Sequence, residues 1–445
     1  MFKFMFSPDG STPHRYSVLV ATVAVLLCVS STAALAQNTT DGSLFSRFGV
    51  GELRTAPSSQ LDAMGGAGTG SFSLNYVNHD NPASWGYQVL TRASVGARYQ
   101  NILIEDGEGQ SSRLQGGSLN SFELSFPLLE QRLGVAFTFS PYSRMNYSTL
   151  QTGELTGTPI SDDPIQFQTS FEGSGGLQQV RGGVGWRLND NLSVGVNASM
   201  LFGLLEQSQE TIFSAGAGLE PTTRANATQV RGFTGTAGIL YAIEDALADG
   251  DVISLGATFT LPTRLSGDRT ETLGTELDRD TLSVQRNSHM DLPMRAQLGV
   301  AYQPDERWLG VADVLYEPWT DFSSDFTGFP VPGTTLEDRW RYSGGVEFTP
   351  AGDDDLAGFL SRVSYRLGGY FDSGYASPTA QQSISTTALT GGLSLPTMAS
   401  GTRIDLGFSA GRRGTLDNDL VRDTFYTVSV TLNIGERWFL RRRLR

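Results

Sequence analysis

The stretch Ile253-Ser254-Leu255-Gly256-Ala257-Thr258-Phe259-Thr260-Leu261 decides the fold, because apolar side chains alternate in it with small or polar ones. The same alternation returns in residues 133–140, 403–410 and 428–434. A period of two is typical of β-strands with one apolar and one polar face. No helical pattern interrupts it between Thr91 and Ile434. The pattern therefore predicts an all-β protein, a transmembrane antiparallel β-barrel whose wall separates lipid from water.

Two kinds of connection take turns between the alternating segments. The short ones are residues 128–131, 189–191, 244–250, 303–306, 350–360 and 397–401, and the longer polar ones are residues 102–116, 151–164, 214–223, 271–280, 321–338, 373–385 and 414–420. Outer-membrane barrels have short periplasmic turns and longer external loops. The alternation predicts about 14 strands within residues 89–435. Residues 165–188, 192–213 and 224–243 exceed the about ten residues that cross a membrane, so we expect the barrel to project above the lipid on the loop side.

Four tryptophans, Trp186, Trp308, Trp319 and Trp340, stand near predicted strand ends. Aromatic side chains gather at that level because their rings suit the lipid headgroup region. We expect them to form aromatic girdles, or alternatively to pack against turns.

The two ends of the chain differ from the predicted barrel. Residues 1–36 have a basic start, a short apolar core and a small-x-small ending, which predicts a cleaved export signal. The only cysteine, Cys28, lies in that core, so we expect a mature chain without disulfides, thiolate metal sites or cysteine nucleophiles. The net charge of −14 disfavours binding to nucleic acid. Residues 436–445 are strongly basic and could contact lipid phosphates or dock a periplasmic protein partner.

Residues 37–88 lack sustained alternation and contain a run rich in glycine and alanine. They are too many for a simple leader to the first strand. They could form a separate periplasmic element, or fold into the lumen as a plug. Glycine suits a plug because it allows sharp turns and close packing against the wall.

A family resemblance rests on two short motifs in this region, Met64-Gly65-Gly66-Ala67-Gly68 and Asn81-Pro82-Ala83. Together they resemble the N-terminal plug of the FadL/OmpP1/TodX hydrophobic-compound transporters, whose 14-strand architecture also matches. The opening at residues 45–51 and the ending at residues 436–439 resemble Bacteroidetes-type members. Residues 74–80 depart from the acidic, small-residue run that precedes the family's Asn-Pro-Ala. The resemblance implies that these eight motif residues belong to a plug.

Pro141 lies inside the predicted strand 132–150. Because proline donates no hydrogen bond to a β-ladder, and a closed barrel has no edge, it predicts a bulge or a kink. The resemblance implies a lateral gate here, through which a hydrophobic ligand leaves into the bilayer. Alternatively, the strand simply leaves the ladder above the membrane.

The function that this reading favours is passive uptake of hydrophobic or amphipathic small molecules, such as fatty acids or aromatic hydrocarbons, across the bacterial outer membrane. The alternatives are a structural or secretion-associated barrel that docks protein partners, and an open porin. His79 and His289 lie in no triad or metal-ligand pattern, so we expect no enzyme activity, metal or cofactor. The expected partners are outer-membrane lipid and a hydrophobic ligand whose binding residues the sequence does not identify.

Overall fold

The structure, a computed structural model, describes residues 42–437 apart from short gaps at residues 57, 74–75, 157–163, 215–217, 276–277, 332, 353, 355, 379–383, 400 and 418–419. All of these residues belong to one compact unit, Thr40–Arg445. The predicted signal peptide and residues 438–445 of the predicted basic tail lie outside the described residues.

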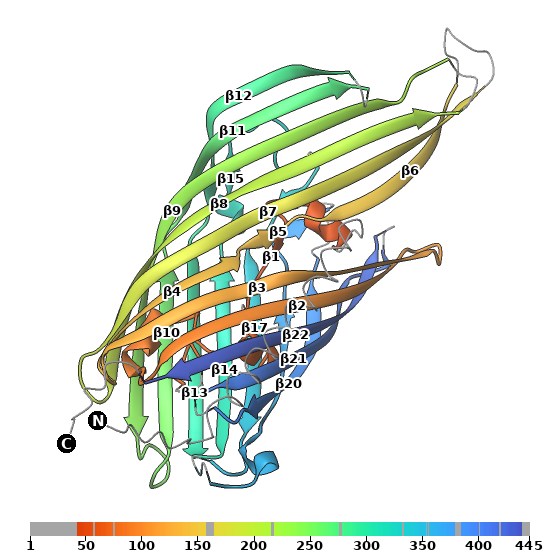
Figure 1. Cartoon of the computed structure of the whole chain (residues 1–445). Helices are drawn as coiled ribbons and strands as arrows, with labels where there is room; N and C mark the ends of the chain where they lie inside the picture. The colour runs from red at the N-terminus through yellow and green to blue at the C-terminus, as the bar shows by residue number, and fades with distance from the viewer. Residues whose placement is uncertain are drawn as a thin grey trace, which may run out of the picture. The chain divides into compact units, whose positions relative to one another are not determined.

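Antiparallel strands close into a barrel of 14 spans, which confirms the predicted fold class (Figure 1). The unbroken spans are β2 (Thr91–Glu105), β3 (Ser111–Leu129), β7 (Ile165–Arg187), β8 (Leu192–Phe213), β9 (Thr222–Glu244), β17 (Arg339–Phe348), β18 (Ser364–Asp372), β20 (Thr386–Pro396), β21 (Arg403–Gly414) and β22 (Arg422–Glu436). The spans in two pieces are β4 (Leu133–Pro141) with β6 (Tyr147–Leu155), β10 (Val252–Thr260) with β11 (Thr263–Gly274), β12 (Arg279–Leu292) with β13 (Arg295–Asp305), and β14 (Trp308–Glu317) with β15 (Ser323–Ser324). The first strand of the barrel, β2, pairs with its last strand, β22, and this pairing closes the ring.

The remaining elements are short. Residues 42–88, here called the N-terminal segment, contain η1 (Leu44–Arg47), β1 (Glu52–Leu53), α2 (Ser59–Ala63) and η2 (Pro82–Tyr87). The others are β5 (Ser143–Arg144), η3 (Trp319–Asp321), β16 (Thr335–Leu336), η4 (Phe359–Arg362) and β19 (Ala376–Ser377). Outside the barrel ladder, β1 pairs with β5 and β16 pairs with β19.

The predicted alternation places apolar side chains on the outside of the barrel. In β10, Leu255 and Phe259 are 49% and 44% exposed, whereas Ser254 between the apolar positions is buried. In β22, Val428 and Ile434 are exposed while Ser429 is buried. The wall therefore turns its apolar face to lipid and its small, polar face to the lumen, as in outer-membrane barrels.

Several predicted boundaries are wrong, and two of them bear on the site. The polar stretch 102–116 is predicted to be a loop, but β2 and β3 stay paired from Ile102 opposite Leu114 to Glu105 opposite Ser111. The predicted strand 132–150 is interrupted, because β4 ends at Pro141 and β6 begins at Tyr147. The polar residues of 102–116 indicate a loop, although most of them form strands, because a strand beyond the lipid does not need an apolar outer face.

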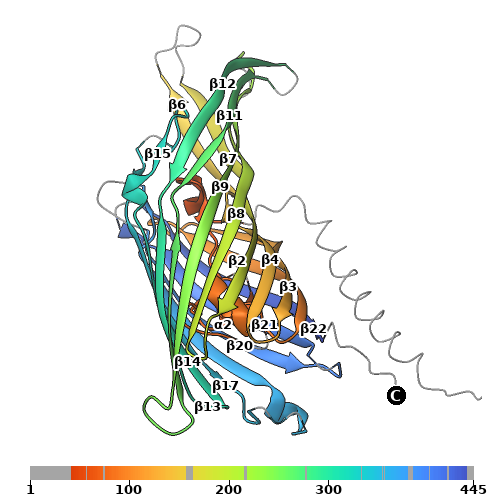
Figure 2. The same cartoon turned by 90° about the vertical axis from the view of Figure 1, so that its left-hand side faces the viewer.

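The N-terminal segment crosses the lumen (Figure 2). Its helix α2 contacts β20, β21 and β22, while its η2 contacts β4, β7, β8 and β9. The segment therefore touches wall strands from two separate arcs of the ring, which fixes where its side chains meet the wall. Its role as a plug stays a prediction.

Candidate functional site

The wall is interrupted beside Pro141. The ladder between β3 and β4 begins at the pair Phe122–Phe139, and β6 pairs with β7 on its other side. Among the described strands, the part of β3 from Ser111 to Ser121 pairs with β2 alone. A break therefore separates this edge of β3 from β6, and the two strands diverge in Figure 1.

The residues after Pro141 turn into the lumen and bind the N-terminal segment. The Arg54 N–H donates to the Tyr142 carbonyl at 2.9 Å, and the Ser143 hydroxyl donates to the Val50 carbonyl at 2.6 Å. On the facing strand β7, Gly176 has a φ of +136°, and a Cβ there would lie 2.4 Å from the Ser143 carbonyl oxygen. Glycine thus makes room for the turn. Sequence reasoning found Pro141 but missed this glycine, although a Gly-Gly pair inside a long strand is a signal for a bulge.

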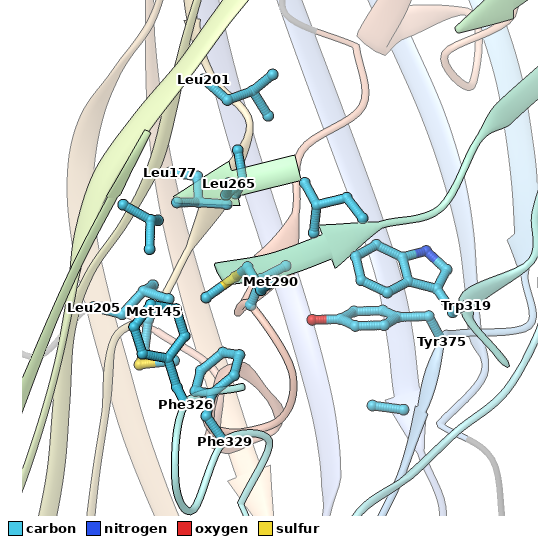
Figure 3. Close-up of a cluster of buried hydrophobic side chains, with 14 of the residues drawn as sticks. Met145, Leu177, Leu201, Leu205, Leu265, Met290, Trp319, Phe326, Phe329 and Tyr375 are labelled. Carbon is cyan, nitrogen blue, oxygen red and sulfur yellow. The ribbon is translucent and has the colours of Figure 1, made fainter. Parts of the chain in front are cut away.

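A buried apolar cluster fills the lumen at the level of the break (Figure 3). Its members come from the break, the wall and the N-terminal segment: Val50, Met145, Tyr147, Leu177, Leu201, Leu205, Val230, Leu265, Met290, Leu292, Trp319, Phe326, Phe329, Tyr375 and Ala376. The ring centroids of Trp319 and Tyr375 lie 4.3 Å apart. Trp319 is therefore buried inside the barrel, and its predicted place in an aromatic girdle is wrong, whereas Trp186, Trp308 and Trp340 are exposed near strand ends.

Next to this cluster lies a cavity of about 340 Å³. Tyr147 lines it together with polar residues of β7, β8, β9 and β11, such as Gln207 and Asn226. Polar lining and an adjacent apolar cluster are both features of small-molecule binding sites.

The motif at residues 64–68 lies in the lumen and packs tightly against the wall. Met64 and Ala67 are fully buried in a second apolar cluster. Gly65 has a φ of +75°, and a Cβ there would lie 2.3 Å from the Gly369 carbonyl oxygen. Gly66 also has a positive φ. These glycines therefore allow a sharp turn and a close approach to the wall, as the sequence predicted.

The motif at residues 81–83 starts η2. The Asn81 side chain accepts a hydrogen bond from the Ala83 N–H and donates to the carbonyls of Thr69 and Ile239, each at 2.9–3.0 Å. Ser193 of β8 donates to the Ala83 carbonyl at 2.6 Å. Asn81 therefore caps η2 while it links this motif to Thr69, the residue after the first motif, and to the wall.

Asp313 of β14 is the main polar anchor of the first motif, and sequence reasoning missed it. One carboxylate oxygen accepts from the Gly68 N–H at 2.8 Å, the Thr69 N–H at 2.9 Å and the Thr69 hydroxyl at 2.8 Å. Gln297 of β13 donates to the same oxygen at 3.1 Å. Nothing in the alternation distinguishes an inward Asp of this kind from an ordinary lumen residue.

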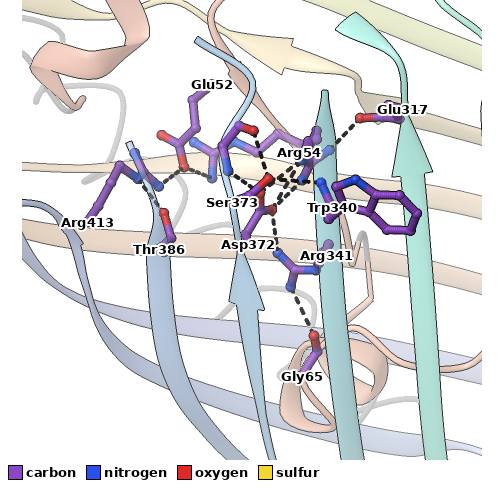
Figure 4. A network of polar contacts seen from close by, with 12 residues as sticks. Glu52, Arg54, Gly65, Glu317, Trp340, Arg341, Asp372, Ser373, Thr386 and Arg413 are labelled. Atoms are coloured by element: carbon purple, nitrogen blue, oxygen red, sulfur yellow. Dashed lines mark hydrogen bonds and ion pairs between the residues drawn. The ribbon is translucent and has the colours of Figure 1, made fainter. Parts of the chain in front are cut away.

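Charged side chains also join the segment to the wall (Figure 4). Glu52 pairs with Arg413 of β21 at 2.9 Å, and Arg341 of β17 donates to the Gly65 carbonyl at 2.9 Å. Burial alone would raise the pKa of Glu52, but Arg413 and Arg54 outweigh it and hold that pKa well below its usual range.

The two histidines of the described residues each lie close to a carboxylate. The His79 Nε2 atom of the segment lies 2.6 Å from a carboxylate oxygen of Glu123 of β3, and both side chains are buried. The His289 Nδ1 atom lies 2.7 Å from a carboxylate oxygen of Asp325 in a more exposed position. The described residues contain no group of three or more metal-ligating side chains. Within that same part of the chain, no helix is long and apolar enough to cross a membrane.

Several solved structures share this fold at low sequence identity. The toluene transporter TbuX of Ralstonia pickettii has a TM-score of 0.52 and 16% identity, over 85% of this chain and 98% of the transporter. A FadL homologue of Pseudomonas aeruginosa has a TM-score of 0.52 and 14% identity, over 88% and 99%. The toluene transporter TodX of P. putida has a TM-score of 0.52 and 15% identity, over 85% and 98%. The predicted resemblance is thus confirmed as a likeness of fold.

A closed β-barrel with an apolar outer face is the architecture of bacterial outer-membrane proteins, so this chain is an outer-membrane barrel. No curated protein matches its sequence significantly. The sequence model of one family matches residues 19–445, nearly the whole chain, and the chain therefore belongs to the BamG family.

Proposed function

We propose that the barrel takes up hydrophobic or amphipathic small molecules, such as fatty acids or aromatic hydrocarbons, without an energy source or cofactor. The observation that carries the proposal is the wall break beside Pro141, which opens next to the buried apolar cluster. The ligand enters from the loop side, passes the cavity lined by Tyr147, and leaves through the break into lipid. No chemical transformation is part of the proposal.

Two finer points belong to this proposal. The N-terminal segment acts as a plug, and its Val50 occupies apolar space that a ligand would otherwise fill. The resemblance at residues 45–51 and 436–439 further suggests a Bacteroidetes-type member of the group.

Binding of a fluorescent fatty acid to the purified barrel in detergent tests the proposal. Met145→Gln places a polar amide at the break within the apolar cluster, and it should weaken binding of the probe. Met398→Gln is the matched control, because Met398 is fully exposed in the turn between β20 and β21. Heat-modifiable migration on a gel checks that each variant is folded. Equal binding by wild type and folded Met145→Gln would contradict the proposed route.

A second candidate function is a structural or secretion-associated barrel that docks protein partners. The dense anchoring of the N-terminal segment favours it, because the wall residues Asp313, Arg413 and Glu123 all bind that segment through buried contacts. An engineered disulfide can distinguish the two candidates, since the hydroxyls of Ser59 and Thr431 lie 2.8 Å apart. Ser59→Cys with Thr431→Cys locks α2 to β22 and should stop uptake, whereas partner docking should survive. The docking candidate also expects co-purifying proteins that are lost on deletion of residues 437–445.

A further inference from the structure

A cavity of about 60 Å³ lies between the N-terminal segment and the wall, and its lining is unusually cationic. Five arginines line it: Arg54 of the segment, Arg98 of β2, Arg339 and Arg341 of β17, and Arg413 of β21. The carboxylates in the same lining are Glu52, Asp62 and Asp372. Guanidinium groups therefore outnumber the carboxylates in a space that protein encloses on several sides.

The ion pairs do not balance this charge, because two of the three carboxylates are shared. Asp372 accepts from Arg339 at 2.6 Å and from Arg341 at 3.2 Å. Glu52 pairs with Arg413 at 2.9 Å, and its carboxylate lies 4.0 Å from the guanidinium group of Arg54.

Charges behind the lining do not change this conclusion. Glu317 pairs with Arg339, but it also pairs with Arg295 at 3.8 Å. Asp423 interacts with Arg413 and adds one negative charge. The surroundings of the cavity therefore keep a net positive charge with all of these groups counted.

Two arginine donors are also unsatisfied. The Nε atoms of Arg98 and Arg341 are buried and have no hydrogen-bond partner, while another nitrogen of Arg98 pairs with Asp62 at 3.1 Å and another of Arg341 donates to the Gly65 carbonyl. The Arg341 side chain is 93% buried, since only 7% of it is exposed. Burial, together with the cations Arg98, Arg144 and Arg413, lowers the pKa of Arg54 to about 10 in spite of Glu52. Buried donors without acceptors carry a large desolvation cost, which a bound anion would remove.

We propose that this cavity binds one small oxyanion of the phosphate or sulfate type. The ion lies between Arg54 of the N-terminal segment and the wall residues Arg98 and Arg341. Guanidinium groups suit such an ion because their fixed N–H donors match oxyanion geometry. The small volume and polar lining favour a free ion over an amphiphile with a tail. The ion cross-links the segment to β2 and β17, independently of the proposed uptake function.

Isothermal titration calorimetry on the mature barrel tests this site, in detergent and chloride buffer free of phosphate and sulfate. Inorganic phosphate should give saturable heat with one site per chain. Arg98→Gln and Arg341→Gln should weaken binding about tenfold or more, since each removes charged hydrogen-bond donors. Arg264→Gln is the matched control, because Arg264 is exposed and pairs with Asp291 away from the cavity. It should bind phosphate like wild type.

Hydrogen exchange gives a second readout. Phosphate should slow exchange of residues 50–56 in the wild type and leave it unchanged in Arg341→Gln. If the wall variants fail the heat-modifiability check for folding, Arg54→Gln takes their place, because its one ion pair is long.

Three results would overturn the proposal: no saturable heat with phosphate, equal affinity in wild type and folded cavity variants, or an effect that chloride reproduces at the same ionic strength. A titration with short-chain phosphatidic acid separates the two sources of phosphate. Binding of this lipid without binding of inorganic phosphate would assign the cavity to a headgroup and refute the free ion.

Discussion

The contact between Asp313 and the N-terminal segment allows a quantitative prediction. Three donors of the segment, the Gly68 N–H, the Thr69 N–H and the Thr69 hydroxyl, reach one carboxylate oxygen at 2.8–2.9 Å. Hydrogen bonds to charged groups contribute roughly 1.5–3 kcal/mol each. Because the three share one acceptor and are not additive, we expect Asp313→Ala to cost about 3–4 kcal/mol of docking free energy. The opening equilibrium of the segment should rise about a hundredfold or more, since about 1.4 kcal/mol is tenfold.

Hydrogen exchange followed by mass spectrometry, on the barrel in lipid nanodiscs, measures this equilibrium. Peptides that cover residues 64–71 should exchange about a hundredfold faster in Asp313→Ala than in wild type. Peptides from β22 serve as an internal reference for the intact wall. Asp291→Ala is the matched control, because Asp291 pairs with the exposed Arg264 at 2.8 Å. It removes the same charge from a neighbouring part of the barrel and should leave residues 64–71 unchanged.

An exchange rate within about threefold of wild type would refute this reasoning, since it corresponds to less than about 0.7 kcal/mol. The segment would then be held by the packing of Met64 and Ala67, which are fully buried. Asp313→Asn should fall between wild type and Asp313→Ala, because the amide keeps one acceptor oxygen. Its NH₂ group would take the place of the other carboxylate oxygen, which accepts no hydrogen bond, while the negative charge would be lost.

Three other perturbations have clear expected outcomes. Gly65→Ala should speed exchange of residues 64–71 by about tenfold or more, because the φ of +75° and the nearby carbonyl of β18 disfavour a side chain. Trp319→Ala should lower unfolding stability in urea by about 3–5 kcal/mol, whereas exposed Trp340→Ala should cost clearly less. Glu52 has a folded pKa below its ordinary 4.5, so its contribution is present above that pH and declines as the pH falls below it. Proteolysis of the N-terminal segment should therefore accelerate below about pH 4.5 in wild type but not in Glu52→Gln, whose cleavage should already be fast at pH 7.

The barrel could be predicted from sequence because a membrane wall imposes its pattern on every residue that touches lipid. Leu255 and Phe259 must face outward, so the period of two survives in each span. Beyond the lipid that constraint ends. β2 and β3 remain paired there as far as Glu105 and Ser111, although their sequence has the polarity of a loop. Hydrogen-bond ladders, rather than side-chain polarity, define the strand ends in this part of the chain.

The site was less predictable, because it depends on contacts between residues far apart in the chain. The close approach at Gly65 could be predicted, since glycine is informative about backbone space by itself. Asp313 and Glu123 could not, because an inward polar residue on a barrel strand is the ordinary case. Only the fold shows that Asp313 lies opposite Gly68 and that Glu123 lies opposite His79.

The wall break and the N-terminal segment share backbone contacts, and this limits how either can move. Ser143 of the break donates to the Val50 carbonyl, and its hydroxyl accepts from the Leu177 N–H of β7 at 3.2 Å. Arg54 of the segment donates its N–H to the Tyr142 carbonyl. Withdrawal of the segment alone would leave the Ser143 hydroxyl and the Tyr142 carbonyl without their partners in the segment. Each lost partner costs roughly 1–3 kcal/mol. Displacement of the segment and widening of the break are therefore energetically coupled. A ligand that occupies the space of Val50 would favour both changes at once.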